Sequence, residues 1–270
     1  MTVAEALALA RWHGVARLDA QLLLGHLTGR ERAWLIANDD IDLSVPDAAA
    51  FEALCVRRAT DEPLAYLVGR KEFRGLELEV NANVLVPRPD TEVLVEWALG
   101  ILAGLRPRAA VVDLGTGSGA IALAVAAACD AVVCATDSSA EALLVARRNA
   151  VRHGLAVEFA QGSWWAPLAS RRFDLALSNP PYVAADDPHL VALRHEPATA
   201  LTPGGDGLGA LREIVQDAPA HLRPGACLLL EHGHDQADAV AALLAAAGFV
   251  DITSRRDLAG RLRCTGGRVP

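Results

Sequence analysis

Residues 111–121 decide the fold, and they read Val111-Val112-Asp113-Leu114-Gly115-Thr116-Gly117-Ser118-Gly119-Ala120-Ile121. An apolar run meets glycines at every second position, and an alanine-rich helical pattern follows. This order is typical of a buried strand that turns through a glycine loop into a helix. The glycines let a ligand approach the backbone closely, and the first helical turn offers unpaired N–H groups. We therefore predict a ligand site at this turn.

Two acidic residues flank the glycine loop and indicate which ligand it binds. Asp113 lies at the strand end, where its carboxylate can reach a ligand's ammonium group, and Asp137 ends the next strand. An acid about 20 residues after the first glycine can accept hydrogen bonds from both ribose hydroxyls of an adenosine-containing cofactor. The spacing is G-x-G-x-G, whereas dinucleotide-binding turns have G-x-G-x-x-G. The pattern favours S-adenosylmethionine over a nicotinamide cofactor.

The third strand of this region ends at the run Gln161-Gly162-Ser163-Trp164-Trp165. Trp164 is a candidate for packing against the adenine face, since aromatic contacts contribute on the order of 1 kcal/mol beyond burial. The alternative, that Trp164 only fills the rim of the core, stays open at this point.

The run Ser178-Asn179-Pro180-Pro181-Tyr182-Val183 follows a fourth apolar strand. Two prolines stop the strand and fix the backbone, so that Asn179 and the Pro180 carbonyl are held rigidly. These two acceptors can take both hydrogens of a planar NH₂ group and stabilise the positive charge that develops on its nitrogen. Tyr182 can cover the planar group with its ring. The motif predicts methylation of an amide or a nucleobase without a metal or a covalent nucleophile, and it leaves these two substrates open.

Strands and helices alternate beyond residue 108, which predicts an α/β fold with a mostly parallel sheet covered by helices on both faces. We expect strands at 110–114, 131–136, 157–161, 173–178 and 227–231, two more within 250–269, and helices at 119–129, 140–153 and 237–247.

The first 70 residues carry helical periodicity at 4–10, 18–27, 48–58 and 63–67. Alternation over 73–80, a turn at 81–83 and a second apolar run at 84–86 then predict a β-hairpin linker. The run Pro87-Arg88-Pro89-Asp90-Thr91-Glu92 begins a helix that Asp90 or Thr91 can cap.

Composition narrows the function further. The 270 residues carry 25 basic and 33 acidic side chains, a formal net charge of −8, and Lys71 is the only lysine. Such a chain is a poor match for a protein that holds long nucleic acid. Five cysteines without a CxxC pair argue against a disulfide framework or a zinc site. No apolar run reaches the roughly 20 residues that a bilayer requires, and no signal segment opens the chain. We expect a cytoplasmic monomer that contacts no membrane.

Motifs along most of the chain resemble the release factor glutamine methyltransferase family (PrmC, also called HemK). They are Glu62-Pro63-Leu64-Ala65-Tyr66-Leu67-Val68-Gly69, Lys71-Glu72-Phe73, Val86-Pro87-Arg88-Pro89-Asp90-Thr91-Glu92, the glycine loop with Asp113, Ser178-Asn179-Pro180-Pro181-Tyr182, Glu196-Pro197-Ala198-Thr199-Ala200-Leu201, Gly205-Asp206-Gly207-Leu208 and Leu230-Glu231-His232-Gly233.

The resemblance implies three parts: a helical substrate-docking domain at 1–70, a β-hairpin linker at 71–87, and a class I, Rossmann-like methyltransferase domain with a seven-stranded sheet at 88–270. It implies transfer of a methyl group from S-adenosylmethionine, leaving S-adenosylhomocysteine. The acceptor would be N5 of the glutamine in the Gly-Gly-Gln motif of bacterial-type class I peptide chain release factors. The implied cofactor residues are Asp113, Gly115, Thr116, Gly117, Ser118, Gly119, Asp137, Trp164 and Asn179. Asn179, Pro180, Pro181 and Tyr182 would hold the substrate glutamine, with Asn179, Pro180 and Tyr182 as the catalytic set.

Two positions depart from the family pattern. Ser163 stands where an acid is common, which puts direct recognition of the adenine amino group in doubt, and Arg74 follows Phe73 where a bulky neighbour is expected. Neither change touches the reacting groups.

Two other function classes remain for comparison. A nucleic-acid methyltransferase acting on adenine N6 or guanine N2 would share the Asn-Pro-Pro-Tyr chemistry, but it must flip a base and hold a phosphate backbone. The acidic chain lacks a basic or aromatic-rich insert for this purpose. A non-catalytic protein that binds a release factor or ribosome component through its helical region is disfavoured because the glycine loop and residues 179–182 are intact.

Overall fold

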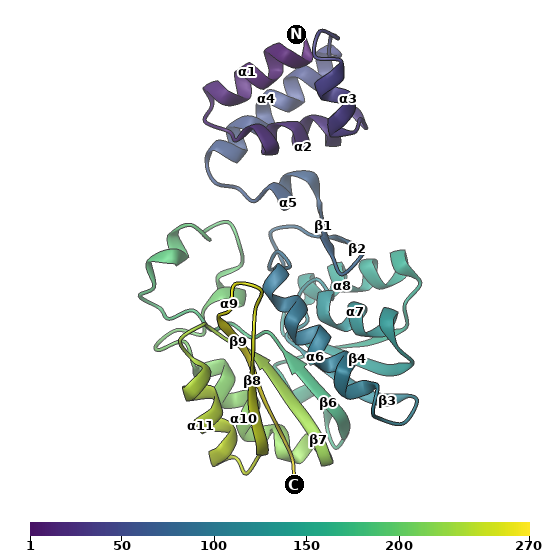
Figure 1. Ribbon diagram of the computed structural model, residues 1–270, viewed down its shortest axis with the longest axis vertical. Coiled ribbons are helices and arrows are strands. Elements are labelled where there is room, and N and C mark those ends of the chain that lie inside the picture. Colours follow the sequence, from purple (N-terminus) through teal and green to yellow (C-terminus); the bar gives the residue numbers. More distant parts are fainter. The chain divides into compact units, whose positions relative to one another are not determined.

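A computed structural model describes all of residues 1–270. The chain forms two compact units, Met1–Arg70 and Lys71–Pro270, which Figure 1 shows with their elements labelled.

The first unit is entirely helical and has its own core. Its helices are α1 (Val3–Trp12), α2 (Arg17–Thr28), α3 (Arg32–Ala37), α4 (Val45–Ala59) and α5 (Leu64–Val68). Thr2 and Glu5 form a capping box at the start of α1, and the Ser44 side chain accepts from the Asp47 N–H at the start of α4. These caps satisfy N–H groups that a helix leaves unpaired. Sequence periodicity missed α3, which is too short to show one.

A two-stranded hairpin opens the second unit, in a register that differs from the prediction. Its strands are β1 (Arg70–Phe73) and β2 (Leu76–Glu79), joined at Arg74 and Gly75 with φ of 48° and 79°. Two-residue hairpin loops with positive φ at both positions match the twist of the flanking strands, so the hairpin turns here. The predicted turn at 81–83 also forms, with the Val84 N–H donating to the Asn81 carbonyl at 3.1 Å, but it joins no second strand. Residues 84–86 form no strand.

A seven-stranded sheet forms the centre of the second unit. Its strands are β3 (Ala109–Leu114), β4 (Ala131–Asp137), β5 (Val157–Gln161), β6 (Phe173–Ser178), β7 (Leu222–Glu231), β8 (Val250–Arg256) and β9 (Leu262–Arg268). The order is β5-β4-β3-β6-β7-β9-β8, with β9 antiparallel to both neighbours and all other pairs parallel. The predicted α/β class is confirmed.

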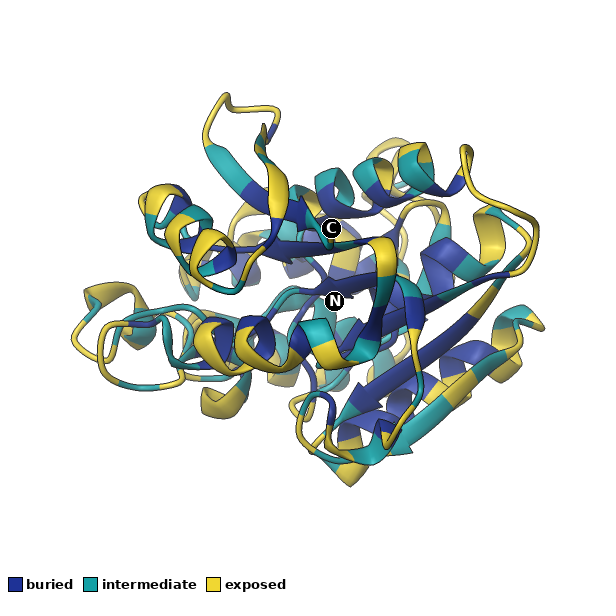
Figure 2. Ribbon diagram, turned by 90° about the horizontal axis from the view of Figure 1, so that it is seen from below, coloured by how far each residue is buried: buried dark blue, intermediate teal, exposed yellow.

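Helices cover both faces of this sheet, and successive strand residues feed two separate cores. Val111 packs with α6 (Glu92–Leu102), α7 (Ala120–Ala128) and α8 (Ala140–His153). Its neighbour Val112 packs on the other face with α10 (Gly209–His221) and α11 (Ala237–Ala246). Figure 2 shows the resulting pattern, with buried strands and helices whose outer sides are exposed. None of the helices combines the length and apolarity that crossing a bilayer requires.

The sheet has a topological switch point between β3 and β6. The chain leaves β3 for β4 on one side and later returns to β6 on the other. The connections after β3 and β6 therefore diverge to opposite faces, which opens a crevice at the carboxyl ends of these strands, where ligands bind in such sheets. The glycine loop follows β3 and Asn179 follows β6, so both predicted motifs lie at this crevice.

Candidate active site at the carboxyl ends of the strands

A cavity of about 240 Å³ lies at this crevice. Eight of the predicted site residues line it, namely Gly115, Thr116, Gly117, Ser118, Asp137, Trp164, Asn179 and Pro181. Four others, Asp113, Gly119, Pro180 and Tyr182, are not among its lining residues. Residues that the sequence analysis did not select, including Thr91, Ser139 and Thr199, complete the wall.

Asp137 holds the glycine loop and keeps acceptor capacity for a ligand. One carboxylate oxygen accepts from the Gly117 N–H at 2.8 Å and the other from the Ser139 N–H at 2.9 Å. Burial raises the pKa of Asp137, and the backbone hydrogen bonds from Ser139 and Gly117 oppose that rise. Each carboxylate oxygen has a second lone pair, so the side chain can also accept from hydroxyl groups of a ligand in the cavity.

Asp113 lies beneath the loop and not in the cavity, which differs from the expectation that it reaches a ligand's ammonium group. Its side chain is fully buried, and Oδ2 accepts from the Thr116 hydroxyl at 2.6 Å and from the Ala122 N–H at 3.2 Å. Oδ1 is buried without a partner. Burial raises the pKa of Asp113 to about 7, although these two hydrogen bonds lower it. Asp113 therefore braces the loop against the start of α7.

Trp164 forms a flat wall of the cavity in an unusual backbone conformation. Its φ is +45°, its ring packs on Gly115, and its indole N–H donates to Glu213 at 2.9 Å. A Cβ at position 115 would lie 2.9 Å from this ring, and the φ of Gly115 is +73°. Both conditions require glycine there. The ring is thus fixed in position beside the loop before any ligand binds.

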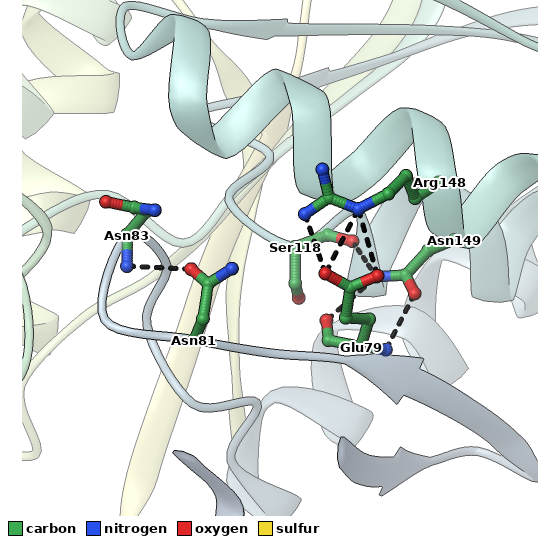
Figure 3. A network of polar contacts seen from close by, with 6 residues as sticks. All are labelled: Glu79, Asn81, Asn83, Ser118, Arg148 and Asn149. Atoms are coloured by element: carbon green, nitrogen blue, oxygen red, sulfur yellow. Dashed lines mark hydrogen bonds and ion pairs between the residues drawn. The ribbon is translucent and has the colours of Figure 1, made fainter. Parts of the chain in front are cut away.

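A buried asparagine ties the glycine loop to the hairpin strand β2. The Asn149 amide of α8 donates to the carbonyls of Ser118 at 2.9 Å and Glu79 at 3.0 Å, and it accepts from the Glu79 N–H at 2.7 Å. Figure 3 shows this network together with the surface ion pair between Glu79 and Arg148. Because each of its three polar contacts is to backbone, Asn149 fixes the position of Ser118 without entering the cavity.

The Asn179 amide is oriented by Thr91, for which the sequence predicted a different role. Thr91 was predicted as a possible helix cap, but no side chain caps this helix start. Instead the Thr91 hydroxyl accepts from Nδ2 of Asn179 at 3.2 Å. The Asn179 side-chain oxygen accepts no hydrogen bond from the protein, and the residue lines the cavity. The oxygen is therefore available to a ligand.

A second buried carboxylate, that of Glu231, contacts the tyrosine of the Asn-Pro-Pro-Tyr turn. The Tyr182 hydroxyl donates to Oε1 of Glu231 at 3.3 Å, while Oε2 has no hydrogen-bond partner. Burial raises the pKa of Glu231 to about 7, and the Thr91 side chain and the charge of Arg263 oppose that rise. The ring of Tyr182 was expected to lie over a substrate, and its hydroxyl points to Glu231.

The backbone of the Asn-Pro-Pro-Tyr turn is held from its far side. The Tyr182 carbonyl accepts from Nε2 of Gln236 at 3.0 Å. A Cβ at Gly207 would lie 2.4 Å from this carbonyl, and the φ of Gly207 is +78°. Any side chain at 207 would displace the turn, so this position of the Gly-Asp-Gly-Leu motif requires glycine for steric reasons.

An ion pair lies at the wall of the cavity. The buried Glu196 carboxylate pairs with Arg88 and also accepts from the Val86 N–H at 2.9 Å. Arg88 and Pro197 both line the cavity. The ion pair thus holds both Arg88 and the backbone at Val86.

Family models and curated relatives of this chain point to the same protein family. Residues 3–69 match the PrmC N-terminal domain, and residues 101–245 match the methyltransferase small domain. The release factor glutamine methyltransferase of Xylella fastidiosa is 50% identical over 271 residues, which is 98% of each chain. That of Bordetella pertussis is 50% identical over 258 residues, covering 94% of this chain and 95% of the relative.

Solved structures share the fold of the second unit at lower identity. The T. Thermophilus 16S rRNA N2 G1207 methyltransferase, solved with AdoMet and guanosine, has a TM-score of 0.56 and 20% identity over 74% of this chain and 50% of that chain. A methyltransferase from Pyrococcus furiosus has a TM-score of 0.55 and 21% identity over 72% of this chain and 88% of that chain. The fold is thus one that methyltransferases use. Since half of its residues are identical to those of such relatives along almost its whole length, the chain is a methyltransferase that belongs to the release factor glutamine methyltransferase family.

Proposed function

We propose that this enzyme transfers a methyl group from S-adenosylmethionine to N5 of the glutamine in the Gly-Gly-Gln motif of peptide chain release factors. One observation carries the proposal. The Asn179 amide is turned by Thr91 so that its oxygen is left without a protein partner at the wall of the cavity. An acceptor held in this way is suited to a primary amide, which brings two N–H donors.

The reaction requires two acceptors because an amide nitrogen is a poor nucleophile. The Asn179 oxygen and the Pro180 carbonyl would each take one N–H hydrogen, which turns the nitrogen lone pair toward the methyl donor. As the new N–C bond forms, positive charge develops on the nitrogen and these acceptors stabilise it. Pro180 is buried and locked by its ring, so the second acceptor needs no reorganisation.

The residues of the cavity fit the proposed cofactor. Asp137 offers acceptors to a ribose diol, the flat ring of Trp164 offers a surface for adenine, and residues 115–118 form the floor. When bound, S-adenosylmethionine supplies a methyl group already activated by its sulfonium. Ser163 lines the cavity where an acid is common, so recognition of the adenine amino group would be water-mediated.

The helical unit would contact the body of the release factor. It contains no part of the cavity described above, and it exposes apolar side chains including Trp12, Leu22 and Val45. The names of the relatives state release factors as their substrates, which supports assigning the same partner to this chain.

Mass spectrometry of an unmethylated release factor after incubation with enzyme and S-adenosylmethionine tests the function. We expect a single added methyl group on the tryptic peptide that contains Gly-Gly-Gln, located at the glutamine. Methylation of DNA or ribosomal RNA without methylation of the release factor would instead support a nucleic-acid methyltransferase. Failure to bind the cofactor in calorimetry would support a non-catalytic binding protein.

A variant of Asp137 tests the cofactor site separately. Asp137→Ala is expected to weaken S-adenosylmethionine binding by about 1–3 kcal/mol, because charged acceptors of hydroxyl groups contribute in this range. The matched control Asp174→Ala changes an acid that lies outside the cavity. An equal dissociation constant for wild type and Asp137→Ala would contradict the assignment.

A further inference from the structure

Trp164, which forms a flat wall of the cavity, has a backbone conformation that a bulky residue rarely adopts. Its φ is +45°, in the left-handed region where a side chain crowds its own backbone. Residues persist in such conformations only when the surrounding structure holds them there. The ring of Trp164 also lies so close to the glycine loop that a Cβ at Gly115 would meet it at 2.9 Å. Both features imply that other residues hold the tryptophan in place.

The backbone of Trp164 is held by the end of β4. The Thr136 side chain is fully buried, and its hydroxyl donates to the Trp164 carbonyl at 3.0 Å. The Thr136 carbonyl in turn accepts from the N–H groups of Gly115 and Thr116, both at 2.9 Å. Thr136 therefore connects the glycine loop to the segment that carries the tryptophan. This connection fixes the main chain of Trp164 but does not by itself fix the plane of its ring.

The ring is held by a residue of α10. A second hollow of about 440 Å³ lies on the other side of Trp164, and Ser163 and Trp164 line both this hollow and the cavity. Glu213, on the exposed side of α10, lines the hollow and accepts from the indole N–H at 2.9 Å. The hollow gives the ring space to turn away from the glycine loop. The hydrogen bond to Glu213 opposes this rotation.

We propose that Glu213 is a positioning residue for cofactor binding, which fixes the plane of the Trp164 ring before the adenine arrives. The inference rests on the proposed function, because it takes this ring as the surface for adenine. Glu213 does not line the cavity, so it acts only through Trp164. A side chain that is already ordered loses less conformational freedom when a ligand binds, and the affinity for the ligand is higher for that reason.

Substitutions on α10 test this role through the dissociation constant of S-adenosylhomocysteine, measured by calorimetry. Glu213→Leu removes the acceptor, and we expect the dissociation constant to rise about fivefold, as for the loss of one hydrogen bond. Glu213→Gln keeps an acceptor oxygen and should stay within about twofold of wild type. Asp217→Leu is the matched control, because Asp217 is an exposed acid that lines the same hollow one turn further along α10.

Two further measurements separate positioning of the ring from general support of the fold. Glu213→Leu added to Trp164→Phe should weaken binding no further than Trp164→Phe alone, because phenylalanine has no N–H to hold. In a ¹⁵N–¹H spectrum, the indole signal of Trp164 is identified by its absence in Trp164→Phe. We expect this indole proton to exchange faster with water in Glu213→Leu than in wild type. At saturating cofactor, kcat should remain within about twofold of wild type, since the reacting groups are unchanged.

The outcomes distinguish this inference from the proposed function. If Glu213→Leu binds S-adenosylhomocysteine as tightly as wild type, or weakens binding equally in the Trp164→Phe background, the positioning role is wrong. A loss in Asp217→Leu as large as that in Glu213→Leu would contradict it as well. A wild type that binds S-adenosylhomocysteine but does not methylate the release factor would count against the proposed function alone. A wild type that does not bind S-adenosylhomocysteine would overturn both.

Discussion

The structure uses two asparagines of the second unit differently, Asn149 outside the cavity and Asn179 at its wall. Asn149 is fully buried and gives both its oxygen and its NH₂ group to backbone partners. Asn179 gives its NH₂ group to Thr91 and keeps its oxygen unpaired at the cavity wall. The first has no capacity left for a ligand, whereas the second has one acceptor reserved. The unpaired oxygen of Asn179 is therefore what distinguishes the amide that we assign to the substrate from the amide that supports the fold.

The strongest test of this comparison is Asn179→Ala. Loss of one preorganised acceptor should reduce methylation of the release factor by about 10²–10³-fold, by analogy with the removal of single stabilising groups from other active sites. Cofactor affinity should remain close to that of wild type, since the glycine loop and Asp137 are unchanged. Rates from single-turnover assays with purified release factor, together with calorimetry, give both quantities. A methylation rate of Asn179→Ala close to that of wild type would show that the unpaired Asn179 oxygen has no role in the reaction.

Asn149→Ala should lower the free energy of unfolding, whereas Asn179→Ala should lower the rate of methylation. It would leave the N–H and carbonyl of Glu79 and the carbonyl of Ser118 without their partner. Unpaired buried groups of this kind cost about 1–3 kcal/mol each, so we expect the free energy of unfolding to fall by about 3 kcal/mol. Urea denaturation measures this change. Unaltered stability with a lost methylation rate would show that the two roles had been assigned the wrong way round.

Asp113 also has an oxygen without a hydrogen-bond partner, but this oxygen is buried beneath the glycine loop and does not face the cavity. Its pKa in the fold is about 7, well above the usual value, because of burial. The folded protein therefore holds a proton on Asp113 at pH values where the unfolded chain has lost it. The stability that comes from this proton is fully present below a pH of about 4 and is lost as the pH rises through about 7. Wild-type unfolding free energy should fall between pH 5 and 8, and Asp113→Asn should reduce that slope by up to about 1.4 kcal/mol per pH unit.

Part of the slope will remain in Asp113→Asn, because the pKa of Glu231 is also raised by burial. Urea denaturation at several pH values checks the difference between the two proteins. Identical slopes would mean that Asp113 stays ionised in the fold.

The smallest effect is expected for Arg148→Gln. This arginine pairs with Glu79 at 2.6 Å, next to Asn149, but half of its side chain is exposed. Exposed ion pairs contribute about 0–1 kcal/mol, so the free energy of unfolding should hardly change. The variant is the neighbour control for Asn149→Ala. A loss as large as that of Asn149→Ala would assign the stabilisation of β2 to charge and not to the buried amide.

The sequence predicted the α/β class and most strand positions because apolar runs bounded by glycine or proline are local signals. The extent of the hairpin was wrong because turns form both at Arg74–Gly75 and at 81–83, and only the first of them joins two paired strands. Helix α10 was missed, and it contains Pro219, which normally indicates a helix end.

Within the site, the loop and the Asn-Pro-Pro-Tyr turn could be selected because their chemistry is visible in short motifs. Thr91 could not be assigned in this way, since its contact with Asn179 spans 88 positions of sequence. The only local signal was that Thr91 lies in a motif shared with the family. Asp113 was placed on the wrong side of the loop because a strand residue's facing depends on the sheet around it.

The contact between Gly207 and the Tyr182 carbonyl has a consequence for mutational tolerance. A methyl group at position 207 would lie 2.4 Å from this carbonyl, so even alanine there forces the backbone of the turn to move. A screen of single substitutions should therefore find position 207 intolerant although it does not line the cavity.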